Sequence, residues 1–550
     1  MINNSEHTGM SNDQIAKAIK FSDRRLSLSP GKDRSEEVKT VRPIKSGVNP
    51  LRVKPARIDG NKQFASVIRH NNPGRLLKTG ASLWFCLMLG GCSPLVGPDY
   101  QKPEQRTPEY FANAAPTGMS FENTEIRWWE QFHDAELNRL VGEGLQSNPD
   151  LKIAVANLRQ ARAMRFLSKF DLFPTVTAGA SERTQQYSIG QFGSSIKPGP
   201  EFDLLNTGFD ATWEVDFFGR IRRSIEAQVS QTESVEAVYR DAMVSLTAEI
   251  ARNYFELRGT QHQLQVARNN ANNQQATLKY TVTTLQGGRG TALDVARAEE
   301  QLESTLGSVP PLEANIRHYI HRLAVLLGLT PEQLYSRLEA EQPLPSAPAI
   351  VAIGSPDKLL QRRPDIRIAE RNLAASTAKL GVVIGDFFPK VQFVGNIALQ
   401  AGTFAGLGGP GGDTYSFGPS IRWAAFDMGR VYTRMQAADA QIEADAANYQ
   451  KSVLRALEET ENSLVDYGRL QVRRDYFRKA VSAAEKSARL ARLRYQNGLF
   501  DFLAVLDAER RLLESQDRLA QTETETATAL VAVYKALGGG WEWGQGEAMP

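Results

Sequence analysis

Few side chains in this 550-residue chain have the spacing of a catalytic, metal-binding or nucleotide-binding site. His318 and His321 lie three positions apart, which would place both imidazoles on one face of a helix, but no third metal ligand is evident. We therefore interpret them as a packed or solvated pair and expect no metal site. The segment from Gly406 to Gly411 fits the glycine pattern of dinucleotide-binding loops, yet it joins two expected strands and no helix follows. It is expected to be a flexible hairpin tip, and no catalytic residue is identified.

One cysteine near the N-terminus is placed for covalent modification. Residues 75–91 begin with the basic residues Arg75 and Lys78, continue in a short apolar run and end in Leu-Gly-Gly before Cys92. This order is typical of a secretory signal peptide and is too short to remain as a membrane span. The ending resembles the lipobox of bacterial lipoproteins, which implies cleavage before Cys92 and a covalent lipid on it. Ser93 does not match the signal for retention in the inner membrane. The alternative is an ordinary signal peptide with a chance cysteine.

Residues 1–74 do not fit this layout, because they are polar and charged and lie upstream of a signal that is normally N-terminal. No methionine occurs between Met10 and Met88. Our hypothesis is an incorrectly assigned start codon, with a non-Met initiator such as Val67.

The sequence is internally duplicated. Residues 148–174 match residues 363–389 at an offset of 215, and Trp213–Gly328 match the second half at an offset of 210. The change of offset falls between Pro174 and Trp213, where we expect a loop. The expected organisation is a polar extension at 1–74, a signal peptide at 75–91, an N-terminal tether at 92–125, a first repeat at 126–335, a linker at 336–354, a second repeat at 355–541 and a tail at 542–550.

Three segments alternate apolar and polar residues with the period of a strand: Phe209–Phe217, Val391–Gln400 and Tyr415–Trp423, with Thr175–Tyr187 as a weaker fourth. A sheet packed on a core would explain the alternation. However, one face is rich in aromatic residues and the other carries charges, which favours lipid on one side and water on the other. Four strands cannot close a barrel, and an open edge is not tolerated in lipid. More than one chain must therefore share the barrel.

Each repeat also contains a very long helical segment. The stretches from about Ile221 to Gln286 and from about Val431 to Gln496 lack proline and are rich in Ala, Glu, Gln, Arg and Leu. Each could extend roughly 80–100 Å as a helix. Shorter returning helices are expected at Thr291–Leu327 and Phe502–Leu537. A cytoplasmic coiled-coil scaffold is the alternative, and the export signal argues against it.

Bulk composition narrows the function. The net charge is +3, with 23% charged residues, which gives no strong attraction to nucleic acid. Mean hydropathy is −0.37, and no stretch of eighteen apolar residues occurs, so we expect no transmembrane helix in the mature chain. Both cysteines, Cys86 and Cys92, precede the body of the protein, which excludes a disulfide framework there.

Several features together resemble the TolC-like outer-membrane efflux factors, and most of all their lipoprotein branch, the OprM/NodT type of RND-type tripartite efflux systems. They are the lipobox, the paired repeats, the Phe-Pro pairs at Phe173 and Phe388, and the sequence Arg494–Leu499 leading to Leu506–Ala508. The resemblance covers about Tyr100 to Trp541. It implies a mixed α and β, internally duplicated fold, in which a trimeric 12-stranded outer-membrane β-barrel with four strands per chain is continued by a long periplasmic α-helical barrel.

The resemblance also implies a function. The expected protein is not an enzyme but a lipid-anchored outer-membrane channel, the passive exit duct of a tripartite pump that exports small molecules such as drugs. Its expected partners are two further copies in a homotrimer, a periplasmic adaptor (membrane fusion) protein, an inner-membrane RND-type pump and outer-membrane lipid, with no nucleic acid and no cofactor beyond the lipid on Cys92. Alternatives are a duct for metal ions or secreted polypeptides, or a periplasmic scaffold lipoprotein without a pore.

Two acidic residues and a tyrosine match family positions at a periplasmic gate: Asp507, Asp294 and Tyr495. Asp507 would form a ring of carboxylates around the axis of the trimer, although a surface ion pair with Arg510 or Arg511 is the alternative. Asp294 would tie neighbouring helices to Tyr495, although Thr291–Asp294 also reads as a capping box.

Two tip turns, at Gly288 and at Gly498 and Leu499, match the family's adaptor-docking turns. Glycine also terminates helices by adopting positive φ, so both roles can hold. A second family gate position is Ala504 here, and the family's arginine partner falls at Phe500. We therefore expect apolar packing to contribute more than charge to holding this tip closed.

Overall fold

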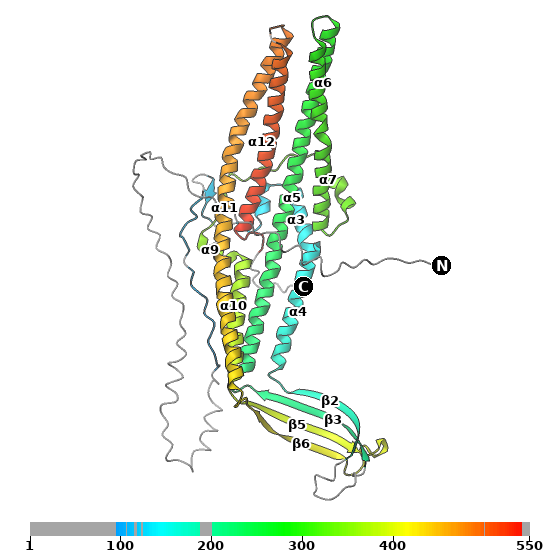
Figure 1. Ribbon diagram of the computed structural model, residues 1–550, viewed down its shortest axis with the longest axis vertical. Helices are drawn as coiled ribbons and strands as arrows, with labels where there is room; N and C mark the ends of the chain where they lie inside the picture. The colour runs from blue at the N-terminus through cyan, green and yellow to red at the C-terminus, as the bar shows by residue number, and fades with distance from the viewer. Residues whose placement is uncertain are drawn as a thin grey trace, which may run out of the picture. The chain divides into compact units, whose positions relative to one another are not determined.

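A computed structural model describes residues 95–105, 107–114, 118–122, 125–186, 201–499 and 501–541 (Figure 1). The polar extension, the signal peptide, Cys92, Phe500 and the C-terminal tail lie outside the described residues. The chain divides into two units, residues 1–84 and 85–550, and every described residue belongs to the second. Within the described residues, no helix combines the length and the apolar character that a membrane crossing requires.

The two halves of the chain have the same order of elements, as the duplication predicts. Each half contains a helix, two antiparallel strands and a very long helix. In the first half these are α4 (Pro149–Phe170), β2 (Thr175–Gln186), β3 (Glu201–Val215) and α5 (Arg220–Gln286). In the second half they are α10 (Pro364–Gly385), β5 (Lys390–Ala401), β6 (Asp413–Arg422) and α11 (Met428–Gln496).

The returning helices differ between the halves. The second half has one, α12 (Phe502–Ala536), close to the predicted span. The single helix predicted at Thr291–Leu327 is wrong, because the structure has two helices, α6 (Ala292–Gly307) and α7 (Val309–Leu326), that meet at Ser308. The break has a local cause. Prolines in the first turn of α7 lack the backbone N–H that would continue α6, and they are well tolerated where a helix begins.

Shorter elements lie between the long ones. They are β1 (Met119–Ser120), η1 (Trp128–Phe132), α3 (Ala135–Ser147), η3 (Pro331–Leu334), α8 (Tyr335–Leu338), β4 (Val351–Ala352), α9 (Pro356–Arg362) and η4 (Phe404–Gly406). β1 pairs in parallel with β4, which joins the tether to the linker between the repeats.

The main hydrophobic core lies where α3, α5, α7 and α12 converge. Trp128 is fully buried there, and its indole stacks on Tyr534 of α12 with 5.0 Å between ring centroids. Phe132 packs on Phe255 of α5 at 4.8 Å. Aromatic pairs of this kind add to the stabilisation that area burial provides. The core thereby joins the two helical hairpins of the chain.

The described part of the tether is held by a buried arginine of α5. The Arg223 side chain, 2% exposed, donates hydrogen bonds to the backbone oxygens of Val96 at 3.0 Å and Gly97 at 3.1 Å, and to the Asp99 carboxylate at 2.8 Å. Further along, the Tyr100 hydroxyl donates to Glu370 of α10 at 2.7 Å. Charged donors make the stronger hydrogen bonds, so Arg223 fixes the tether beside the start of α5.

The four long strands form one antiparallel sheet in the order β2-β3-β5-β6. β3 is longer at its start than the predicted Phe209–Phe217, because residues from Glu201 onward pair with β2. It ends at Val215, because the Asp216 carboxylate accepts hydrogen bonds from the first backbone amides of α5, at Ile221 and Arg222, both at 3.0 Å. The sheet extends from the ends of α4 and α10, and the turns between the hairpin helices lie at the opposite end of the helices (Figure 1).

Candidate functional site

One face of the sheet is apolar and exposed. Phe209 of β3 lies opposite Ile397 of β5, which lies opposite Tyr415 of β6. These side chains are 60%, 69% and 73% exposed, and Phe417 is 82% exposed. Large contiguous apolar surface of this kind marks contact with lipid or with a partner. The prediction that these alternating segments form strands with one aromatic face is confirmed.

The opposite face of the sheet is polar. Asp210 lies opposite Asn396, whose amide donates a hydrogen bond to the Asp210 carboxylate at 2.7 Å, and Ser416 lies next to Asn396 on β6. Gln400 and Asn206 form a similar row further along, at 3.4 Å. The two faces therefore differ in polarity, as expected of a sheet with lipid on one side and water on the other.

The sheet has two free edges. β2 and β6 each pair with one strand only, so the outer backbone groups of both strands have no strand partner within the described residues. In hydrocarbon each unpaired backbone group costs several kcal/mol, and open sheet edges do not occur there. An apolar sheet with open edges is thus incomplete as a single chain.

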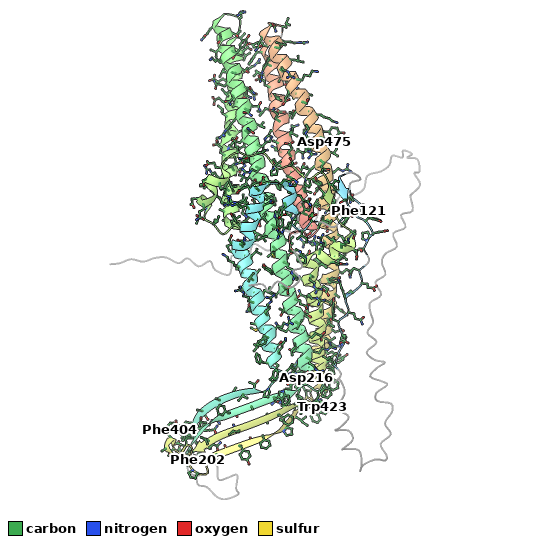
Figure 2. The ribbon with its side chains drawn as sticks, turned by 180° about the vertical axis from the view of Figure 1, so that it is seen from behind. Phe121, Phe202, Asp216, Phe404, Trp423 and Asp475 are labelled. Atoms are coloured by element: carbon green, nitrogen blue, oxygen red, sulfur yellow. The ribbon has the colours of Figure 1, made fainter. Side chains whose placement is uncertain are left out.

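Two tryptophans mark the end of the sheet next to the helices, and sequence reasoning had not assigned them a role. The Trp213 indole donates a hydrogen bond to the Leu172 backbone oxygen at 2.9 Å, and the Trp423 indole donates to the Phe387 oxygen at 3.0 Å. Figure 2 shows Trp423 and Asp216 at this end and Phe404 at the other. The two contacts are related by the duplication, and the recurrence of tryptophan at both positions was the signal in the sequence that could have indicated a shared role. Tryptophan is enriched where a membrane meets water.

At the other end of the chain's helices, glycines with positive φ form both hairpin turns. φ is 70° at Gly288 and 71° at Gly498. The Gly498 N–H donates to the Tyr495 oxygen at 2.9 Å and the Leu499 N–H donates to the Arg494 oxygen at 2.9 Å, which is the pattern of a glycine-terminated helix. A Cβ at either glycine would meet nothing within 4 Å, so backbone conformation is the local reason for glycine. Leu499 is 71% exposed.

The structure places Asp294 in the cap of α6. Its carboxylate accepts hydrogen bonds from the Thr291 N–H at 3.1 Å and hydroxyl at 2.7 Å, while the Asp294 N–H donates to the Thr291 hydroxyl at 3.2 Å. This is the complete capping box that the spacing predicted. The charge of Asp294 also acts on Tyr495. Burial, together with that charge, raises the pKa of Tyr495. The structure therefore brings Asp294 and Tyr495 into one neighbourhood.

Tyr495 belongs to an aromatic cluster at the tip. Its ring contacts Tyr280 of α5 at 5.8 Å and Phe502 of α12 at 5.3 Å. Phe502 and Val505 are 2% and 1% exposed and anchor a small apolar core between α11 and α12. Apolar packing thus connects the two hairpins beside the turns.

Asp507 lies apart from that cluster, on the exposed side of α12. Its carboxylate accepts a hydrogen bond from Arg511 at 2.9 Å, and the two side chains are 59% and 73% exposed. Arg510 pairs with Glu514 instead, at 3.3 Å. Ion pairs this exposed contribute little to stability. Asp507 is therefore a surface residue of the single chain, outside the apolar cluster.

The structure also places the remaining sequence candidates. His321 contacts the Tyr335 hydroxyl through its Nε2 atom. The glycine-rich segment Gly406–Gly411 connects β5 to β6 and no helix follows it directly.

Comparisons with known proteins agree with this architecture. The family model for outer membrane efflux proteins matches residues 140–329 and 355–539. Nodulation protein T of Rhizobium leguminosarum bv. trifolii is 29% identical over 463 residues, which cover 83% of this chain and 96% of that protein. The probable efflux pump outer membrane protein TtgC of Pseudomonas putida is 30% identical over 469 residues, covering 84% of this chain and 95% of that protein.

Solved structures show the same fold. The structure of the outer-membrane channel OprN has a TM-score of 0.77 and 41% sequence identity, and the match covers 81% of this chain and 99% of that one. The channel CmeC of Campylobacter jejuni has a TM-score of 0.76 at 22% identity, with 83% of this chain covered and 96% of that one. The two family segments correspond to the two repeats. The chain therefore belongs to the outer membrane efflux proteins.

Proposed function

We propose that the chain is one third of an outer-membrane channel, the passive exit duct of a tripartite efflux pump that exports small molecules such as drugs. The observation that carries this is the four-stranded sheet with a bare aromatic face, a polar face and two free edges. Three copies would supply twelve strands and remove every edge, with lipid outside and water inside. The helices would continue this duct into the periplasm.

The anchoring and the partners are further parts of the proposal. Cys92 would carry the covalent lipid that holds the N-terminus in the outer membrane, which the Leu-Gly-Gly-Cys ending supports. A periplasmic adaptor protein would dock at the turns of Gly288, Gly498 and Leu499, and an inner-membrane RND-type pump would supply the energy. The duct itself would perform no chemical step and would hold no other cofactor.

The periplasmic end would carry the gate. Three copies of Asp507 around the axis would form a carboxylate ring, which the exposed position of this residue supports. Asp294 and Tyr495 would act together at the neighbouring turns, as their electrostatic contact supports.

Three measurements test the proposal. The detergent-purified protein should run as a trimer that dissociates on heating, and it should conduct ions in planar bilayers. A gene deletion should raise the accumulation of amphiphilic drugs in cells. Altered metal tolerance or protein secretion without a drug phenotype would favour the other cargoes. A monomer without conductance would favour a scaffold.

A further inference from the structure

At the end away from the helices, the sheet extends further through β2 and β3 than through β5 and β6. β3 pairs with β5 only from Leu205, which lies opposite Ala401. Within the described residues, 201–204 pair with β2 alone, opposite residues 183–186. Figure 2 shows Phe202 at this end of the sheet. A two-stranded ribbon, residues 183–186 and 201–204, therefore continues beyond the four-stranded part of the sheet.

The length of the apolar face determines where the hydrocarbon of a membrane would end. On that face of β3, every second side chain from Val215 to Leu205 is apolar except that of Thr207. Ten residue steps extend roughly 33 Å along a strand. With strands tilted by about 40°, this corresponds to a height of about 25 Å, which is that of the apolar band of outer-membrane barrels. The ribbon would therefore lie beyond the hydrocarbon.

The two faces of the sheet exchange polarity in the ribbon. On the face that is apolar elsewhere, the ribbon carries Glu201 and Asp203, and the Asp203 carboxylate accepts a hydrogen bond from the Thr184 hydroxyl at 2.7 Å. On the face that is polar elsewhere, it carries Phe202 and Leu204, both half-buried. Beyond the hydrocarbon, the apolar side chains thus lie on the face that would line the lumen.

This exchange does not result from a change of register. β2 pairs with β3 residue by residue along the whole of Thr175–Gln186. Without a bulge, every second residue of a strand stays on the same face. Phe202 and Leu204 therefore share a face with Asn206 and Asp210. The residue types change at the end of the strand, while the backbone keeps its alternation.

Contact with lipid does not account for these two side chains. Outside the hydrocarbon, both faces of the ribbon would meet water or polar headgroups, so neither face is expected to be apolar. Apolar side chains in a water-filled lumen are unfavourable unless they approach other apolar groups. A two-stranded ribbon twists more strongly than a wide sheet, and only one strand supports the other here. The ribbons of the copies could therefore bend toward the axis and bring their apolar faces together.

We propose that Phe202 and Leu204 form an apolar collar at the outer mouth of the duct, which slows hydrophilic solutes and lets amphiphilic molecules pass. The collar rests on the proposed function, because it requires the polar face to line the lumen. Apolar constrictions close pores to water and ions by dewetting. An amphiphilic molecule presents its own apolar surface to the collar, whereas a hydrophilic solute loses hydrogen bonds to water there. Phe404, which is 81% exposed, adds apolar surface at the same end (Figure 2).

Thiol labelling of intact cells tests the collar in the full-length protein. Both native cysteines precede residue 95, so Ser416→Cys introduces a single thiol into the sheet, on its polar face. A maleimide-PEG too large for general porins would reach this thiol from outside only through the mouth. Phe202→Ser with Leu204→Ser should speed this labelling by roughly tenfold or more, because a polar group without a hydrogen-bond partner is slowed by about that factor.

Two control variants separate the collar from a general loosening of the sheet. Leu205→Ser changes the adjacent residue, which lies on the opposite face, and should leave the labelling rate at the parental value. Phe202→Leu with Leu204→Met keeps the inner face apolar and should also leave it unchanged. All variants carry Ser416→Cys, and heat-modifiable trimers on a gel show that each one assembles.

The outcomes separate the collar from the proposed function. Faster labelling in the double serine variant alone supports the collar. A parental rate in that variant, in protein that still exports drugs and reacts fully with small N-ethylmaleimide, overturns the collar and leaves the duct intact. Equal acceleration by Leu205→Ser also overturns it. A Ser416→Cys thiol that no maleimide reaches in any variant, together with loss of drug export, overturns the proposed function and the collar with it.

Discussion

At Gly259, α5 and α12 lie so close together that we expect no room for even one additional methyl group. A Cβ built on Gly259 would lie 1.9 Å from the Thr524 hydroxyl oxygen, 2.6 Å from its methyl and 2.8 Å from its Cβ. Rotation of the Thr524 side chain removes the first two contacts but not the third, because the Cβ is fixed to the backbone. Gly259→Ala must therefore move the two helices apart.

The size of the effect follows from this geometry. Carbon atoms pack at about 3.5–4.0 Å, so the helices must separate by roughly 1 Å. The contact is closely packed on all sides, because Thr524 is 7% exposed and nearby Thr522 is fully buried. Overpacking of this kind costs about 1–3 kcal/mol. Alanine recovers up to about 1 kcal/mol of helix propensity. We expect Gly259→Ala to destabilise the protein by up to about 2 kcal/mol.

A matched control lies at almost the equivalent position of the other long helix. A Cβ on Gly468 of α11 would meet nothing within 4 Å in this chain. Gly468→Ala should therefore be neutral or stabilising by up to about 1 kcal/mol. Both variants would be compared with the parent by thermal melting of the detergent-purified oligomer, followed by far-UV circular dichroism.

The reasoning also predicts rescue. Thr524→Gly removes the fixed Cβ, so it should be less harmful in the Gly259→Ala background than in the parent. Equal melting temperatures for Gly259→Ala and Gly468→Ala would refute the packing argument. So would a Thr524→Gly effect that is the same in both backgrounds.

Three other predictions concern the pore, the tether and pH. Asp507→Ala should raise conductance in planar bilayers, because it removes the proposed carboxylate ring, and an unchanged conductance would count against the gate. Arg223→Met should weaken the hold on the tether by about 2 kcal/mol, since the backbone oxygens of Val96 and Gly97 lose a charged donor. That corresponds to roughly 30-fold faster chymotrypsin cleavage after Tyr100 of the released tether, and cleavage at the parental rate would contradict it. Burial, with Asp365 nearby, raises the pKa of Asp241. Because the pKa is raised in the folded state, the ionised carboxylate destabilises the folded protein at neutral pH. This destabilisation disappears as the pH falls through the raised pKa toward 3.8, the ordinary pKa of aspartate. Asp241→Asn should therefore stabilise the protein at pH 7 but not near pH 3, and an equal gain at both values would show that charge is not the cause.

Local pattern was enough to predict the duplication, the four strands and the long helices. Apolar and polar residues alternate along a strand wherever its two faces meet different environments. The segments around Phe209, Ile397 and Tyr415 could therefore be assigned as strands from residue types alone. The ends of α5 and α11 were also predictable, because Gly288 and Gly498 supply a positive φ that other residues rarely adopt.

Other features depended on contacts between distant residues. The extension of β3 to Glu201 follows from pairing with β2, which residue types at 201–208 do not reveal. Whether Asp507 would pair with Arg510 or with Arg511 depended on side-chain geometry, and Arg511 is the partner. The hold of Arg223 on the tether joins residues more than 120 positions apart.

The sequence by itself determined the repeated elements and the two-faced sheet, because these follow from short periodicities and from the preferences of individual residues. Only the tertiary structure decided which strand lies beside which and where the sheet ends. Those properties depend on contacts between segments far apart in the chain, and the order β2-β3-β5-β6, with its two free edges, is what makes one chain incomplete.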